Sequence, residues 1–292
     1  MADERTRYLE IQRELGGDEV ILSKPLGMAE GGKDGKTEGR KDARSEGEAR
    51  EGLHSAERPA VRADRGPATP PVNLPSFRPT DWRKGAPALP TVPGLVVQAP
   101  QRGLMDPAPA WENLDEVART IAGCRKCFLC EGRTHTVPGE GSSTAKLMFV
   151  GEGPGQTEDQ TGRPFVGKAG ELLTQIIEAI GLRREEVYIA NAVKCRPPQN
   201  RKPLPDELAA CWPYLERQIE LIRPGVLVAL GATAAEALLQ ARKSLAELRG
   251  RVHSYRGIPL VVTYHPAALL RNPNWKKPTW DDVRIARQLL DR

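Results

Sequence analysis

The stretch LMFVGEGPGQTEDQTGRPFVGKAG, residues 147–170, decides how the chain around it folds. Its apolar run at 147–150 predicts a short buried strand that ends at Gly151. A glycine-rich loop with the carboxylates Glu152, Glu158 and Asp159 comes next. From Gly167 apolar residues recur at helical spacing and predict one buried helix face: Leu172, Leu173, Ile176, Ile177 and Ile180. Because ligands of open α/β sheets bind at the carboxyl ends of strands, we expect the acidic loop to form part of a site.

Alternating strands and helices continue to the end of the chain. Three more apolar runs have the length and composition of strands: 187–193, 226–230 and 258–264. Helical patterns precede or separate them: 114–121, 205–222 and 231–240. Thr279 is the expected N-cap of a last helix, with Asp282 three residues on. The sequence therefore predicts an α/β fold with three α/β/α layers and a central, mostly parallel four-stranded sheet.

The N-terminal third has a different composition. Residues 23–108 are rich in Gly, Pro, Arg, Glu and Ala and contain few large apolar side chains. Such a segment cannot bury enough surface to offset the entropy of ordering it. We therefore predict a mostly disordered region at 1–108, with a helical pattern only near 3–15, and a folded domain at 109–292. Its charges either are solvated or contact nucleic acid or other proteins.

Net charge and hydropathy limit the partners and the cellular location that we expect for this protein. Its 292 residues carry a formal net charge of +5, which is compatible with nucleic-acid binding but does not establish it. No apolar run approaches the ~18 residues of a membrane helix, and the first residues lack a signal-peptide pattern. We expect a cytoplasmic protein.

All five cysteines lie between Cys124 and Cys211, and clustered cysteines in a cytosolic protein favour metal binding over disulfides. Cys124-x2-Cys127 forms a half-site, and Cys195-x15-Cys211 can supply the other two ligands. A [4Fe–4S] cluster and a structural zinc ion both suit four such thiolates, and the long second gap favours the cluster. Cys130 adds an alternative, because Cys124, Cys127 and Cys130 could supply three ligands by themselves.

Three sequence blocks together resemble the family 4 uracil-DNA glycosylases, which are iron–sulfur enzymes. The first comprises GEGPG at 151–155 and TGRPFVG at 161–167, the second NAVKCRPP at 191–198, and the third HPAALLR at 265–271. The resemblance covers 111–292 in the family's order and does not reach the N-terminal third. Four cysteines match the family pattern, and Cys130 is a departure that we treat as spare.

The resemblance implies an enzyme that hydrolyses the N-glycosidic bond of uracil in DNA and leaves an abasic site. It implies catalytic roles for Glu152, Glu158 and His265. It implies substrate binding by Gly153, Phe165, Asn191 and Asn200. Its cluster ligands would be Cys124, Cys127, Cys195 and Cys211. Phe165 would stack on the flipped base, the Asn191 amide would pair with its edge, and His265 would stabilise the leaving anion. How Glu152 and Glu158 share their roles stays open.

The partner implied by the resemblance is uracil-containing DNA, single- or double-stranded, bound by a monomer. Leu269, Leu270 and Arg271 correspond to the loop that enters the minor groove, with a leucine as wedge and the arginine on phosphate. No histidine follows the second block, which favours a turning-over hydrolase over a protein that traps its DNA covalently. The alternative is a non-catalytic DNA-binding or polymerase-associated module with a structural metal, which would not need Asn191, Phe165 and His265 together.

Overall fold

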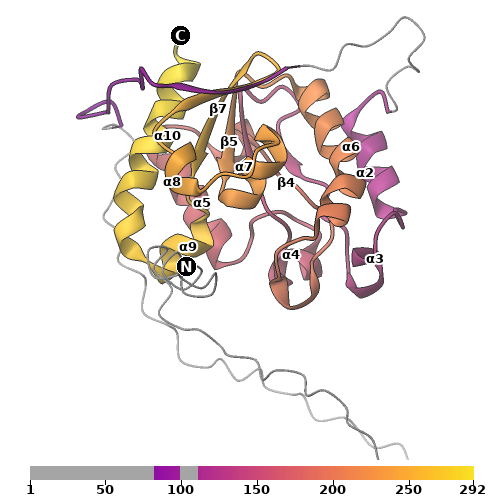
Figure 1. Cartoon of the computed structure of the whole chain (residues 1–292). Coiled ribbons are helices and arrows are strands. Elements are labelled where there is room, and N and C mark those ends of the chain that lie inside the picture. Colours follow the sequence, from indigo (N-terminus) through magenta and orange to yellow (C-terminus); the bar gives the residue numbers. More distant parts are fainter. Residues whose placement is uncertain (1–81, 99–110) are drawn as a thin grey trace, which may run out of the picture. The chain divides into compact units, whose positions relative to one another are not determined.

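The computed structural model describes residues 82–98 and 111–292, which form a seven-stranded sheet with helices on both faces (Figure 1). The helix expected near 3–15 lies outside these residues. Of the region expected to be mostly disordered, 1–108, residues 82–98 are described, and they include a strand at Pro93–Val97. The spatial order of the strands is β1 (Pro93–Val97), β6 (Val252–Tyr255), β7 (Ile258–Thr263), β5 (Val226–Leu230), β3 (Leu147–Gly151), β4 (Tyr188–Asn191) and β2 (Glu140–Gly141).

The four strands predicted from the sequence form the parallel centre of the sheet. β4, β3, β5 and β7 are neighbours in that order and all run in the same direction. Three strands that were not predicted extend the centre at both edges. β6 pairs antiparallel with β7, β1 parallel with β6, and β2 antiparallel with β4. The mostly parallel α/β/α sheet is confirmed, but the described part of the chain has seven strands instead of four.

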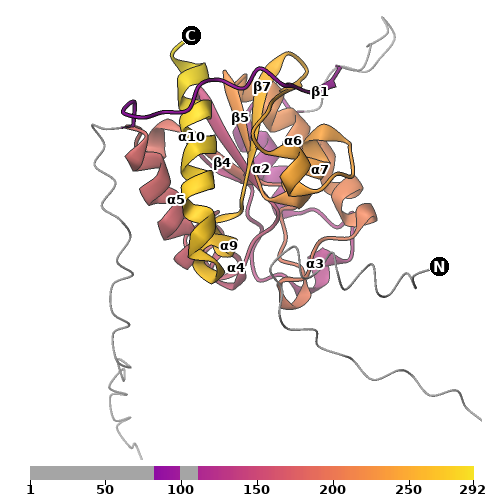
Figure 2. The ribbon, with the colours of Figure 1, turned by 60° about the vertical axis from the view of Figure 1, so that its left-hand side comes forward.

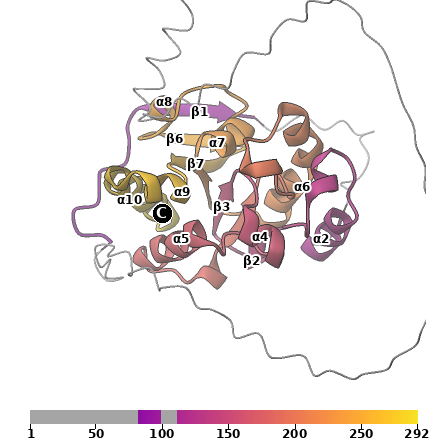
Figure 3. The ribbon, with the colours of Figure 1, turned by 90° about the horizontal axis from the view of Figure 1, so that it is seen from below.

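Helices cover both faces of this sheet. They are α2 (Leu114–Ala122), α3 (Leu129–Gly132), α4 (Gln156–Thr161), α5 (Lys168–Ala179), α6 (Pro205–Ile222), α7 (Ala232–Leu239), α8 (Leu245–Leu248), α9 (Pro266–Arg271) and α10 (Lys276–Leu290). α5 and α10 lie on one face (Figures 2 and 3), and α6 and α7 lie on the other with α2 beside α6. None of the described helices is both long and apolar enough to cross a membrane.

β3 shows why the sheet needs a helical layer on each side. Successive side chains of a strand point to opposite faces. Met148 and Val150 therefore join the core beneath α6 and α7, whereas Leu147 and Phe149 join the core beneath α5 and α10. Every residue of β3 is buried, as expected for a parallel strand covered on both faces.

The prediction that Thr279 caps the last helix is wrong. α10 begins at Lys276, so Thr279 lies inside its first turn and is buried. Pro278 is tolerated there because the first N–H groups of a helix have no intrahelical partner. Asp282 does not complete a capping box; its Oδ2 accepts hydrogen bonds from Arg249 Nε at 2.8 Å and Thr263 Oγ1 at 2.7 Å.

The loop after β3 contains a helix that the sequence did not predict. α4 carries Glu158 and Asp159 in its first turn, and Gly162 ends it in the left-handed conformation with a φ of 71°. Asp159 is buried and its Oδ1 accepts from the backbone N–H of Thr134 at 2.9 Å. The predicted acidic loop is therefore an ordered cap over the carboxyl end of β3.

Candidate functional site

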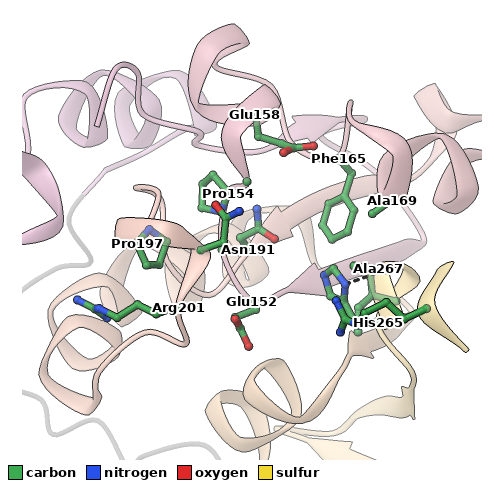
Figure 4. Close-up of a pocket in the computed structure, with 15 residues that line it drawn as sticks. Glu152, Pro154, Glu158, Phe165, Ala169, Asn191, Pro197, Arg201, His265 and Ala267 are labelled. Atoms are coloured by element: carbon green, nitrogen blue, oxygen red, sulfur yellow. Dashed lines mark hydrogen bonds between the residues drawn. The ribbon is translucent and has the colours of Figure 1, made fainter. Parts of the chain in front are cut away.

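A cavity of about 320 Å³ opens at the carboxyl ends of the parallel strands. Of the residues predicted to act on substrate or DNA, eight line it: Glu152, Gly153, Glu158, Phe165, Asn191, Asn200, His265 and Arg271. Figure 4 shows Asn191 between Glu152 on one side and the Phe165 and His265 pair on another. The parallel strands bring these residues together because their carboxyl ends meet at one edge of the sheet.

Asn191 presents an unpartnered polar group to this cavity. It is the last residue of β4 and is 1% exposed. Its Oδ1 is buried and has no hydrogen-bond partner. A buried acceptor without a donor costs free energy, so the position suits a ligand that brings an N–H group. Gly151 makes room for the amide, since a Cβ at that residue would lie 2.4 Å from Asn191 Oδ1.

Phe165 forms a second wall in an uncommon backbone conformation. Its φ is 50°, and Gly170 permits this turn because a Cβ there would lie 2.0 Å from the carbonyl oxygen of Phe165. Glu158 fixes the same turn: its Oε1 accepts from the backbone N–H groups of Val166 at 2.9 Å and Gly167 at 2.8 Å. The Glu158 carboxylate is therefore engaged in holding the Phe165 loop.

His265 lies opposite, with its ring centroid 5.4 Å from that of Phe165. It is the N-cap of α9, and its Nδ1 accepts from the backbone N–H of Ala267 at 3.2 Å. Because Nδ1 accepts, the proton of the neutral ring is on Nε2. The pKa of His265 is lowered to about 4, chiefly by burial and to a smaller extent by Arg271, and Glu158 opposes the shift. The ring is therefore a neutral Nε2–H donor near pH 7.

Glu152 is held by a residue that the sequence analysis missed. The hydroxyl of Thr233 donates to Glu152 Oε2, and Thr233 is buried in the first turn of α7. No described residue donates a hydrogen bond to Oε1 of Glu152. Thr233 lies just after β5, so the rule that strand ends converge could have identified it.

The residues predicted to contact DNA separate into exposed and buried ones. Leu270 is 39% exposed, but Leu269 is 1% exposed and packs in the core beneath α5 and α10, so it has no surface to offer DNA. Asn200 is exposed on the rim, where its Oδ1 accepts from Arg196 Nε at 2.8 Å. Arg201 also lines the cavity and forms two hydrogen bonds, at 2.6 and 2.8 Å, with Glu207.

All five cysteines line a second, much smaller cavity of about 10 Å³. Cys124 and Cys127 lie in the segment between α2 and α3, Cys130 lies in α3, Cys195 lies after β4, and Cys211 lies in α6. Among the described residues, no three Cys, His, Asp or Glu side chains are close enough to hold a single metal ion. The cysteines therefore share a cavity without forming a compact single-ion site.

Three cationic residues line this cysteine cavity: Lys126, Arg133 and Lys194. Arg133 Nη1 donates to Cys195 Sγ at 3.2 Å, and the backbone N–H of Lys194 donates to Cys211 Sγ at 3.3 Å. Burial raises the pKa of the Cys211 thiol to about 12, while Lys194 opposes the shift. Burial lowers the pKa of Lys194 to about 8, and Cys211 opposes that shift. Arg133 and Lys194 thus oppose the rise that burial causes in the pKa of the Cys195 and Cys211 thiols, without reversing it.

This chain is similar to known uracil-DNA glycosylases. The model of the Uracil DNA glycosylase superfamily matches residues 138–286. The Type-4 uracil-DNA glycosylase of Thermotoga maritima is 50% identical over 185 residues, which cover 62% of this chain and 96% of that protein. The Type-4 uracil-DNA glycosylase of Sulfurisphaera tokodaii is 46% identical over 187 residues, which cover 61% of this chain and 85% of that protein. That of Archaeoglobus fulgidus is 44% identical over 189 residues, covering 62% and 95%.

Proposed function

We propose that the cavity at the strand ends holds a flipped uracil, because the chain belongs to the type-4 uracil-DNA glycosylases of the uracil-DNA glycosylase superfamily. The chain is accordingly a hydrolase that excises uracil from DNA in repair. A base must leave the duplex stack before an enzyme can act on it, and the cavity is open to receive one. The single observation that carries the proposal is the unpartnered Oδ1 of Asn191 inside this cavity.

In this proposal, Asn191 reads the uracil edge. Its Oδ1 accepts from uracil N3–H, and its amide nitrogen donates to O4. Cytosine has no N3–H group and carries a donor in place of O4, so it leaves the buried amide unpaired. Phe165 stacks on the base, held in place by the Glu158 contacts with Val166 and Gly167. We assign Glu158 chiefly to this positioning role.

His265 and Glu152 act on the two charges that develop as the bond breaks. The electron pair of the N1–C1′ bond leaves with uracil, and the His265 Nε2–H group stabilises the resulting anion at O2. The sugar becomes cationic at C1′ and is stabilised by the Glu152 carboxylate, which Thr233 orients. A water oxygen then bonds to C1′, and its proton passes to Glu152. Glu152 then releases this proton and the uracil anion takes one up, so that the products are free uracil and an abasic site.

The exposed residues around the cavity are assigned to DNA. Leu270 fills the gap left by the flipped nucleotide, and Arg271 contacts phosphate. Asn200, held by Arg196, lies on the rim next to the position of the sugar and phosphate. Leu269 is not included, because its side chain belongs to the core.

We further propose that Cys124, Cys127, Cys195 and Cys211 hold a [4Fe–4S] cluster, with Cys130 as a spare thiol in the same cavity. A cluster binds each thiolate through a different iron atom, so it does not need the compact ligand group of a single zinc ion. The flanking Arg133 and Lys194 suit the negative charge of such a group. The cluster would tie the segment between α2 and α3 to α6 and to the segment after β4.

A uracil-excision assay tests the proposal. A labelled oligonucleotide with one uracil is incubated with the protein and then treated with hot alkali, which breaks the strand at abasic sites. Asn191→Ser should lower the excision rate by at least about 100-fold. The same change at the exposed Asn113, where serine remains a good helix cap, should leave it unaltered. If cluster-loaded protein cleaves no uracil substrate, a non-catalytic DNA-binding module becomes the better explanation.

A further inference from the structure

Lys194 is a buried cation between the two cavities. Its side chain is 1% exposed. Its ammonium group donates to the backbone carbonyl of Asn191 at 2.9 Å and to Gln218 Oε1 at 2.7 Å. Both acceptors are neutral, and no carboxylate of the described residues forms an ion pair with Lys194. A buried ammonium group in this setting is costly unless a negative charge lies nearby.

In the described part of the chain, the acidic group that acts on Lys194 is the Cys211 thiol. Lys194 lines the cysteine cavity, and its own backbone N–H donates to Cys211 Sγ. Gln218 cannot supply the missing charge, because its amide is neutral and donates to the Pro138 carbonyl at 2.7 Å and the Tyr188 hydroxyl at 3.2 Å. The fold thus places a buried cation beside the cysteines and gives it only neutral hydrogen-bond acceptors among the described residues.

We propose that Lys194 is the buried counter-charge of the cysteine site and, through the same ammonium group, a positioning residue for Asn191. This inference rests on the proposed function, in which the Asn191 amide reads uracil. The ammonium group fixes the carbonyl at the carboxyl end of β4, and the side chain of that same residue faces the uracil cavity. Loading the cysteines with an anionic cluster therefore stabilises the cation that fixes the base-reading residue.

Arg133 provides a contrast within the same site. It donates to Cys195 Sγ and to the carbonyls of Cys124 and Ala122, but it is partly exposed to solvent. Water can solvate Arg133 when the cysteines carry no charge, whereas it cannot reach Lys194. Only Lys194 also contacts the strand that carries Asn191. The coupling between the two cavities is thus assigned to Lys194.

Two substitutions separate its charge from its hydrogen bond. Lys194→Gln removes the charge but keeps an N–H donor for the Asn191 carbonyl, and Lys194→Met removes both. Lys146→Gln, on the exposed surface, is the control. Holoprotein of each variant is treated with an iron chelator, and the half-life of the cluster's visible absorbance and the bound iron are measured. Both Lys194 variants should lose the cluster about tenfold faster than wild type and the control.

The second readout is the single-turnover excision rate per cluster-loaded molecule. Lys194→Met should be at least about tenfold slower than Lys194→Gln, because only methionine leaves the Asn191 carbonyl without its donor. Wild-type cluster half-lives in Lys194→Gln would overturn the counter-charge role. Equal excision rates in the two variants would overturn the positioning role. If Lys194→Met does not fold, the half-life of Lys194→Gln decides alone. An inactive wild type would instead refute the proposed function, since the chelator result does not depend on excision.

Discussion

Substituting Gly151 by alanine should strongly lower the rate of uracil excision without unfolding the protein. Gly151 lies beneath the uracil cavity, and its φ is not positive, so an alanine backbone is unstrained there. The added Cβ, however, would lie 2.4 Å from Asn191 Oδ1 and 2.5 Å from Phe165 Cζ. Ordinary contacts begin at 3.4 Å, so each group must retreat by about 1 Å. Both belong to the proposed uracil-binding walls.

The size of the effect follows from that displacement. A misplacement of about 1 Å in a positioning group can cost about 100-fold in rate. We expect a loss of that size in the single-turnover excision rate on a uracil oligonucleotide, with affinity for uracil-free DNA unchanged. Overpacking should also lower the free energy of unfolding by about 1–3 kcal/mol, which a urea titration will measure.

Gly225→Ala is the matched control. The same Cβ there would meet its nearest atom, the Lys146 carbonyl oxygen, at 3.5 Å, which is an ordinary contact. It should therefore leave excision unaltered. If folded Gly151→Ala excises uracil within about threefold of this control, Asn191 and Phe165 do not position the base as we argue.

Three further predictions concern other parts of the site. The folded pKa of His265, about 4, lies below its usual value, so the stability it contributes is complete above about pH 6.5 and is lost as pH falls toward 4. Urea titrations at about pH 7 and 4.5 measure this loss, with His265→Asn, which keeps a capping side chain, as the control. Between these pH values the free energy of unfolding should fall by ~2 kcal/mol more in wild type than in His265→Asn, and equal losses would contradict this. Glu158→Gln keeps an acceptor for the Phe165 loop, so its excision rate should stay within about fivefold of wild type. Glu158→Ala removes the acceptor and should lower the excision rate by at least about tenfold. The reverse order of the two rates would exclude the positioning role. Leu270→Ala should slow excision from double-stranded DNA more than from single-stranded DNA. Leu269→Ala should instead lower the free energy of unfolding by about 2–5 kcal/mol. A stable Leu269→Ala variant that loses activity only on duplex DNA would reverse the assignment.

The central fold could be predicted because buried parallel strands leave a strong signal in sequence. Each of β3, β4, β5 and β7 is an apolar run next to a helical pattern. The edge strands lack that signal. β2 has two residues, β6 reads Val-His-Ser-Tyr with alternating burial, and β1 is a largely exposed strand in a proline-rich segment. β1 and β2 pair with strands that are distant in sequence, and local patterns do not encode such pairing, whereas β6 forms a tight hairpin with β7.

The membership of the site could be predicted, but its internal contacts could not. The motifs place Glu152 and Glu158 in one loop without saying what each carboxylate touches. Their different roles depend on how the chain closes: Thr233 approaches one and the Phe165 loop the other. Leu269 and Leu270 are equally apolar neighbours, and only the packing of α9 decides which one is exposed. The monomeric state, the cytoplasmic location and the contacts of the N-terminal region stay predictions.

The segment Asn-Ala-Val-Lys-Cys at 191–195 shows why two unrelated chemistries share one sequence block. Asn191 ends β4 at the uracil cavity, and Cys195 lies in the cysteine cavity. Between them the chain stays attached to the loop after β3, because Val193 donates its N–H to the Glu152 carbonyl at 3.1 Å. The Lys194 ammonium then reaches back to the Asn191 carbonyl. A change in the position of Cys195 must therefore move Lys194 and the end of β4 together. For this reason we expect the cysteine site to influence the position of Asn191 as well as the stability of the fold, although we assign it no part in bond cleavage.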